Sequence, residues 1–154
     1  MKEYETNIIN AIELSKMEFV ISVPTSGIDN VYKYFESKER CIYSTREDEA
    51  MAIAAGLSIN KNKSIVIIQQ SGVGNLLNTM FTLIESYDFY FPVLVYDRGS
   101  GDINPIHWIS SNNTNRVINS LYNSIKIDFT KEESTQQFLA GIRQNIIWFF
   151  AQTS

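Results

Sequence analysis

One short segment, Ser64 to Gln69, constrains the fold of this chain more than any other. Its four central residues, Ile-Val-Ile-Ile, are all apolar, so a strand formed here has two apolar faces. Such a strand is typical of a parallel sheet that helices cover on either side. Residues 91–96, with the sequence Phe-Pro-Val-Leu-Val-Tyr, form a second segment of this kind. We therefore expect a covered and mostly parallel sheet.

Helical and strand patterns alternate along the rest of the chain. Strands are predicted at residues 18–23, 40–44, 64–69, 91–96 and 125–129. Helices are predicted at residues 4–16, 26–37, 45–60, from the turn at 71–75 to about 85, 115–123 and 130–152, with a polar loop at 98–114. This alternation predicts an α/β fold with a doubly wound, mostly parallel sheet of about six strands and helices on both faces. The length of 154 residues fits a single domain, residues 1–154.

The composition excludes several classes of protein. There are 13 basic and 17 acidic residues, a net charge of −4, so the chain has no excess of cations for binding nucleic acid. Cys41 is the only cysteine and His107 the only histidine, which excludes a disulfide framework and two-histidine metal motifs. Cys41 lies in a predicted strand and is interpreted as a buried, unreactive thiol.

No segment has the character of a membrane span or a secretion signal. The longest apolar run has 8 residues, far below the ~18 that a membrane span needs. The first five residues, Met-Lys-Glu-Tyr-Glu, lack the apolar core of a signal peptide. We expect a cytoplasmic protein that binds neither nucleic acid nor membranes.

Ligands of a doubly wound sheet bind beyond the carboxyl ends of its strands. Four segments are predicted to lie there: residues 24–27, 45–49, 70–75 and 97–108. The glycine turn at 70–75 does not complete a nucleotide motif, because Leu77 stands where a dinucleotide fingerprint has its third glycine and no Gly-Lys-Ser/Thr follows. We interpret it either as a packing turn between strand and helix or as a loop that closes on a ligand from a partner chain.

Three consecutive acidic residues, Glu47, Asp48 and Glu49, open the helix predicted at 45–60. Acids in a first helical turn stabilise the helix through its dipole, so they need no further role. The residues that follow are small and apolar, however. If this helix is buried, at least one carboxylate faces a site of low dielectric constant, where it can hold or exchange a proton.

His107 and Arg98 are the other polar candidates. His107 is interpreted either as a polar surface residue or, at the end of the sheet, as a proton donor or substrate contact. Arg98 is interpreted either as a ligand of an anionic substrate or as the partner of a surface acid. The large aromatic residues Trp108, Trp148 and Phe149 are interpreted as core or interface residues.

Five segments occur together in a characteristic order. They are Val23–Ser26, Arg46–Gly56, Gln70–Asn75, Phe91–Leu94 and Arg98–Gly99. In this order they resemble the pyrimidine-binding domain of thiamine diphosphate enzymes, closest to phosphonopyruvate decarboxylase and the alpha subunit of sulfopyruvate decarboxylase. The resemblance covers about residues 10–112 and implies a subunit of a 2-oxo acid decarboxylase.

The resemblance also implies which residues act. In this family a glutamate nine residues before the glycine of an Ala-Ala-Gly stretch contacts the pyrimidine ring, and Glu47 stands nine residues before Gly56. Glu47 would activate thiamine diphosphate to the ylid that attacks the substrate, and His107 is the second catalytic candidate. Arg98 and His107 would contact the substrate. Further cofactor contacts are implied for Pro24, Thr25, Ser71, Gly72, Gly74 and Asn75.

A partner chain is implied as well. Related full-length enzymes bind the diphosphate and Mg²⁺ in a second domain, through a Gly-Asp-Gly motif. Residues 101–103, Gly-Asp-Ile, lack the final glycine and are not interpreted as this motif. We expect a beta subunit to supply the diphosphate-binding domain and to hold the Mg²⁺, so that no metal ligand is expected in this chain. Alone, the chain is expected to be inactive and to bind cofactor weakly; a homodimer of this chain within the hetero-oligomer stays open.

Two other functions stay open. The same cofactor and partner would serve a carboligase of a biosynthetic pathway, which couples two carbonyl compounds. A non-catalytic regulatory module on the same fold is the third possibility, although it would have no use for the carboxylate of Glu47. The nature of the 2-oxo acid is not implied, since Ile106 precedes His107 where the family often has glutamine.

Overall fold

The computed structural model of the protein describes residues 1–98 and 105–152. Six strands form one sheet in the order β2-β1-β3-β4-β6-β5, and every neighbouring pair is parallel. The strands are β1 (Phe19–Ser22), β2 (Cys41–Tyr43), β3 (Ser64–Gln69), β4 (Val93–Tyr96), β5 (Ser124–Asp128) and β6 (Trp148–Gln152). The predicted fold class and the strand number are confirmed.

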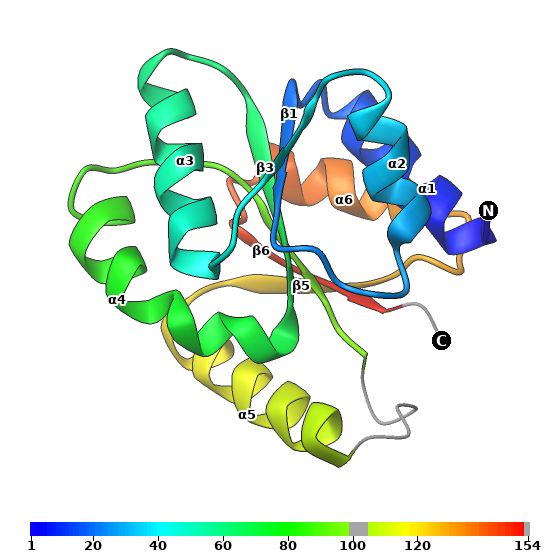
Figure 1. Cartoon of the computed structure of the whole chain (residues 1–154). Coiled ribbons are helices and arrows are strands. Elements are labelled where there is room, and N and C mark those ends of the chain that lie inside the picture. Colours follow the sequence, from blue (N-terminus) through cyan, green and yellow to red (C-terminus); the bar gives the residue numbers. More distant parts are fainter. Residues whose placement is uncertain (99–104, 153–154) are drawn as a thin grey trace.

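The helices lie in two layers on opposite faces of this sheet (Figure 1). One layer contains α1 (Glu3–Leu14), α2 (Asp29–Glu36) and α6 (Ser134–Arg143). The other contains α3 (Glu47–Ile59), the 3₁₀ turn η1 (Gln70–Asn75), the short α4 (Leu77–Thr79), the π-helical turn η2 (Met80–Ile84) and α5 (Pro105–Leu121). Within the described residues, no helix is long and apolar enough to cross a membrane.

The strands join the two layers because their side chains alternate between the faces. In β3, Ile65 and Ile67 pack in the cluster that contains α1, α2 and α6, whereas Val66 and Ile68 pack in the cluster with α3 and α5. Each of these four side chains is fully buried. This double burial explains why the run is continuously apolar, as the sequence predicted.

The secondary structure predicted for two segments is wrong. Residues 98–114 were expected to form a loop, but α5 begins at Pro105, a residue that suits the first position of a helix. Asparagine and serine are weak helix formers, so packing and not propensity supports this helix. Its buried Ile118 lies in the core, and Thr114 Oγ1 donates a hydrogen bond to the backbone oxygen of Gln70.

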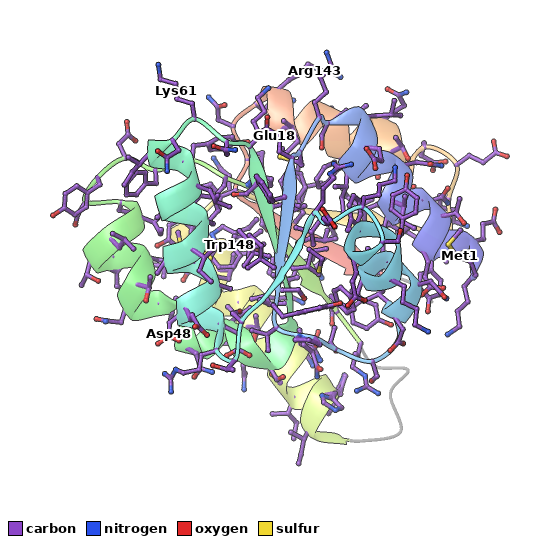
Figure 2. The ribbon with its side chains drawn as sticks, turned by 45° about the horizontal axis from the view of Figure 1, so that its top comes forward. Met1, Glu18, Asp48, Lys61, Arg143 and Trp148 are labelled. Carbon is purple, nitrogen blue, oxygen red and sulfur yellow. The ribbon has the colours of Figure 1, made fainter. Side chains whose placement is uncertain are left out.

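The second error concerns residues 130–152, which were expected to form one helix. The helix α6 ends at Arg143, and Asn145 then adopts a positive φ of 55°, which turns the chain into β6. Trp148 and Phe149 on this strand are fully buried, so their interpretation as core residues is confirmed. In Figure 2, Trp148 lies in the interior of the molecule, whereas Asp48 lies at its edge.

The order of the strands places a reversal of the winding direction between β1 and β3. From β1 the chain moves outward to β2, and it then crosses to β3 on the opposite side of β1. Ligands of doubly wound sheets bind where the winding reverses in this way, outside the carboxyl ends of the strands. Here that position lies between the end of β1 and the end of β3.

Candidate functional site

Glu47 is the first residue of α3, which follows the end of β2. Its side chain is half-buried and reaches across to the glycine turn η1, where Asn75 Nδ2 donates a hydrogen bond of 2.9 Å to Glu47 Oε2. The other carboxylate oxygen, Oε1, lies directly over Gly72. Two of the four predicted site loops therefore meet at this one carboxylate.

Gly72 is required by this arrangement. A Cβ atom at position 72 would lie 2.2 Å from Glu47 Oε1 and 2.5 Å from Glu47 Cδ, so no side chain fits there unless Glu47 moves. Gly74 differs, because a Cβ atom there would have nothing within 4 Å. The glycine turn is thus shaped around Glu47 at one of its two glycines only.

The two neighbouring carboxylates have structural partners. Asp48 forms two hydrogen bonds with Arg46, of 2.9 and 3.0 Å, and this guanidinium holds the pKa of the Asp48 carboxyl below its usual value. Glu49 accepts hydrogen bonds from the backbone nitrogen and the hydroxyl of Thr45, which lower its pKa. These two acids stabilise the start of α3 as the helix dipole favours. Glu47 is the carboxylate that turns toward the glycine loop.

A second cluster lies where β1 and β3 end. The hydroxyl of Thr25, which is buried, is 2.8 Å from one end of the Gln69 amide, and His107 Nδ1 is 3.0 Å from the other end. His107 Nε2 is in turn 3.5 Å from Arg98 Nη1. Residues from β3, from the segment after β1, from the end of β4 and from α5 therefore meet at this edge.

The next residue, Gln70, holds α5 in place. Its side chain is fully buried, with Nε2 3.5 Å from the backbone oxygen of His107 and Oε1 3.4 Å from the backbone nitrogen of Arg98. The buried Asp97 supplies a further attachment, since it accepts a hydrogen bond of 2.6 Å from Ser111 on α5. His107 is therefore presented by the first turns of an anchored helix and not by a loop.

Several sequence-predicted residues have no such contacts. Pro24, Ser71 and Gly74 are exposed at the same edge of the sheet. Gly99, named with Arg98 in the resemblance, and the Gly-Asp-Ile segment at 101–103 lie outside the described residues. Across the described ranges 1–98 and 105–152, no group of three or more His, Cys, Asp or Glu side chains could hold a metal ion.

Two interpretations of single residues need correction. Trp108 is 49% exposed, which excludes the core and leaves the interface alternative of its interpretation. It lies in the first turns of α5, which the sequence had predicted as loop. Cys41 lies in a strand as predicted but is only partly buried, and this burial raises the pKa of its thiol.

No individual role was predicted from the sequence for Gln69, Gln70 or Asp97, although the last two lie in the predicted site segments 70–75 and 97–108. Gln69 and Gln70 stand at the end of an apolar strand, where two glutamines break an otherwise apolar pattern. That break was the available signal, because a polar side chain at the carboxyl end of a buried strand reaches the ligand-binding edge. Asp97 gives the same signal at the end of β4.

Several curated proteins are similar in sequence to this chain. The chain is 34% identical over 98 residues to the sulfopyruvate decarboxylase subunit alpha of Methanocaldococcus jannaschii, a match that covers 62% of this chain and 57% of the relative. It is 29% identical over 94 residues to that of Methanococcus maripaludis, covering 60% and 56%. It is 27% identical over 86 residues to that of Methanothermobacter thermautotrophicus, covering 54% and 52%. The chain thus matches little more than half the length of these curated relatives.

A solved structure with the same fold is the 2-oxoglutarate:ferredoxin oxidoreductase of Magnetococcus marinus. The TM-score is 0.64 at 14% identity, and the match covers 99% of this chain and 28% of that chain. No protein-family model matches the chain. The curated relatives nevertheless confirm the resemblance of this chain to the alpha subunits of sulfopyruvate decarboxylases.

Proposed function

We propose that this chain is the pyrimidine-binding alpha subunit of a split thiamine diphosphate-dependent 2-oxo acid decarboxylase. The observation that carries the proposal is the placement of Glu47, which α3 and the glycine turn hold at the ligand-binding edge of the sheet. The names of the curated relatives support the same reaction class. The solved neighbour supports the fold.

The residues present fit the pyrimidine end of thiamine diphosphate. Gly72 lacks a side chain where a Cβ would collide with Glu47, so the carboxylate lies against bare backbone. One of its oxygens is held by Asn75, which orients the group without neutralising its charge. A carboxylate held in this way can accept a hydrogen bond from a ring nitrogen and hold a proton there.

Thiamine diphosphate, when bound, would supply an electron sink for the bond between the carboxylate and the carbonyl carbon of the substrate. The role of Glu47 would be to keep a proton at the pyrimidine nitrogen N1′, which favours the imino tautomer of that ring. Thr25, Ser71 and Asn75 would line the cofactor from the ends of β1 and β3. The protein thereby contributes orientation and one placed acid, while the cofactor contributes the difficult chemistry.

Arg98 and His107 would face the substrate. An arginine suits a carboxylate or another anionic group, because its planar guanidinium can make two parallel hydrogen bonds. The contact of 3.5 Å between Arg98 Nη1 and His107 Nε2 keeps the two groups together at the end of β4. We assign them the binding of the 2-oxo acid.

The diphosphate and Mg²⁺ would be held by a beta subunit. The relatives are named as alpha subunits, which supports a two-chain enzyme. The cofactor would then lie between the two chains, with its pyrimidine against this one. The chain alone would bind it weakly and would be inactive.

Calorimetric titration tests the proposal directly. Thiamine diphosphate and Mg²⁺ are titrated into this chain together with a candidate beta subunit that carries the Gly-Asp-Gly motif, and carbon dioxide release is followed over a panel of 2-oxo acids. The variant Glu47→Gln should abolish turnover, whereas Asp48→Asn should retain it, because Asp48 pairs with Arg46 and not with the glycine loop. Failure of the complex to bind the cofactor would refute the proposal, as would equal turnover in wild type and Glu47→Gln.

Product analysis separates the two enzymatic possibilities. Both reactions release carbon dioxide from the 2-oxo acid, but a decarboxylase then releases an aldehyde, whereas a carboligase joins the remaining acyl unit to a second carbonyl compound and releases an acyloin. A complex that binds cofactor but produces only the acyloin would replace the decarboxylase by the carboligase.

A further inference from the structure

Gln69 links two residues of the candidate site that lie far apart in the sequence. Its amide is 2.8 Å from the hydroxyl of Thr25 at one end and 3.0 Å from His107 Nδ1 at the other. Because Gln69 is the last residue of β3, the sheet fixes the position from which its side chain starts. The amide therefore bridges the end of β1 to the first turns of α5.

The contacts of the His107 ring restrict where its proton lies. A neutral imidazole has one nitrogen that donates a hydrogen bond and one that accepts. Arg98 Nη1, 3.5 Å from His107 Nε2, can only donate. This contact favours Nε2 as the acceptor, with the proton on Nδ1, but at 3.5 Å it is too long to fix the tautomer by itself.

The orientation of the Gln69 amide follows from this assignment. The two ends of a glutamine amide have nearly the same shape, so the hydrogen-bond network decides which end faces which partner. As placed in the structure, the amide has Oε1 toward Thr25 and Nε2 toward His107; Nδ1 would then have to accept, and an N–H at Nε2 would point at the donors of Arg98, so the amide is better turned over. With the amide oxygen toward His107, Nδ1–H donates to Gln69, the amide nitrogen donates to Thr25 Oγ1, and Nε2 accepts from Arg98.

We propose that Gln69 is a positioning residue that holds His107 as the Nδ1–H tautomer, so that Nε2 is presented beside Arg98 as a hydrogen-bond acceptor. Thr25 contacts Gln69, Gln69 contacts His107, and His107 contacts Arg98, so each hydrogen bond orients the next side chain in this series. The meaning of this order for catalysis rests on the proposed function. There His107, through the single acceptor position at Nε2, orients the guanidinium that binds the anionic substrate.

The single histidine makes this proposal directly measurable. His107 is the only histidine in the chain, so all side-chain signals of ¹⁵N-labelled histidine come from one ring. Long-range ¹H–¹⁵N correlation spectra distinguish the protonated from the unprotonated ring nitrogen. Spectra are recorded on the full chain at about two pH units above the ordinary imidazole pKa of ~6.5. We expect a protonated Nδ1 and an unprotonated Nε2.

Two variants separate the role of Gln69 from a general loosening of α5. Gln69→Met keeps the length of the side chain but removes the amide, and it should give a mixture of both tautomers. Thr114→Val removes the hydroxyl that ties α5 to the backbone oxygen of Gln70 without touching the ring, and it should keep the wild-type pattern.

The proposal is overturned by either of two results. The first is a wild-type spectrum with the proton on Nε2, which needs no substitution and so does not depend on whether a variant folds. The second is a Gln69→Met spectrum with the same pure tautomer as wild type. Both are measured without cofactor, partner or substrate, so failure here leaves the calorimetric test of the proposed function unaffected, and the reverse also holds.

A kinetic measurement connects the tautomer to the reaction. In the active complex, Gln69→Met should lower kcat/KM for the 2-oxo acid by roughly tenfold, mainly by raising KM, because a misoriented Arg98 weakens substrate binding. A residue that only stabilised the fold would lower the unfolding midpoint and leave KM of the folded enzyme unchanged. An unchanged KM together with a changed tautomer would overturn the link to Arg98.

Discussion

Replacing Gly72 by alanine is the sharpest perturbation of the carboxylate that the proposed function depends on. The new Cβ atom would lie 2.2 Å from Glu47 Oε1, so the carboxylate must retreat by roughly 1 Å or more to restore an ordinary contact distance. That movement breaks the 2.9 Å hydrogen bond from Asn75. The variant therefore displaces Glu47 without changing its chemistry.

The expected effects on stability and on function differ in size. The atoms that meet the new methyl group belong to the far end of a flexible, half-exposed side chain, which can swing toward solvent. The loss of stability should then be close to that of one partly exposed hydrogen bond, about 1 kcal/mol. In the proposed complex, a catalytic group misplaced by about 1 Å should lower turnover by on the order of 10²-fold.

The assay combines urea unfolding of the chain with turnover of the complex, and Gly74→Ala is the matched control. A Cβ atom at Gly74 meets nothing within 4 Å, so this variant should be as stable as wild type or more stable by up to about 1 kcal/mol. Its turnover should be at most slightly changed. The two glycines are two residues apart in one turn, so an effect of the turn's flexibility would appear in both variants.

A double-mutant cycle supplies the refutation. In a Glu47→Ala background the obstacle at position 72 is absent, so Gly72→Ala should cost nothing there. The coupling energy between positions 47 and 72 should be about 1 kcal/mol, which exceeds the deviation from additivity of ~0.3–0.5 kcal/mol that independent sites show. An equal loss of stability in both backgrounds would show that Gly72 is needed for a reason other than Glu47.

Two further predictions concern stability. Glu5 is 2% exposed; burial by itself raises its pKa, but hydrogen bonds from Asn30 and from the backbone of Lys2 outweigh it and leave the pKa below the usual 4.5. The stabilisation from the ionised Glu5 should be complete above that value and be lost as the pH falls through the lowered native pKa. Glu5→Gln should therefore lower the free energy of unfolding by about 2 kcal/mol at neutral pH. In urea unfolding at a series of pH values, the variant should lose less stability than wild type as the pH is lowered. Gly27→Ala should lower the free energy of unfolding by roughly 1–3 kcal/mol, because Gly27 has a φ of +105° and a Cβ there would lie 2.5 Å from the hydroxyl of Tyr96. Adding Tyr96→Phe removes the collision but not the backbone strain, so it should recover only part of this loss in thermal unfolding. Full recovery would contradict a backbone origin.

The sequence predicted those parts of the fold in which local pattern and tertiary burial agree. The segment 64–69 was predicted with the bounds that β3 has, because its residues are buried on both faces. The helix α5 was missed because its asparagines and serines favour loops locally, while the contacts that hold it come from distant residues. The strand β6 was missed because Ile146 to Ala151 follow a helical pattern directly and a continuous apolar run does not reveal its period.

The sequence likewise predicted part of the candidate site, namely which residues belong to it, but not the contacts between them. The carboxylates at 47–49 were recognised as a group, but their different roles depend on the directions of three side chains. Those directions are set by Arg46, Thr45 and Asn75, and the last of these lies 28 residues from Glu47. The contact between Gln69 and His107 spans 38 residues and has no local signature.

The position of β6 within the sheet has a consequence for the order in which the molecule assembles. β5 pairs with β6, whereas β4 and β5 are not neighbours, because β6 lies between them. As the ribosome extends the chain, β5 is made before β6 and has no strand to dock against until β6 follows. The segment from α1 to β4 can form its four-stranded part of the sheet first. Until β6 is present, β5 has no neighbouring strand to pair with. Folding of this half therefore depends on β6 pairing with both β4 and β5, a non-local step of the kind that slows folding and leaves apolar segments transiently exposed to chaperones.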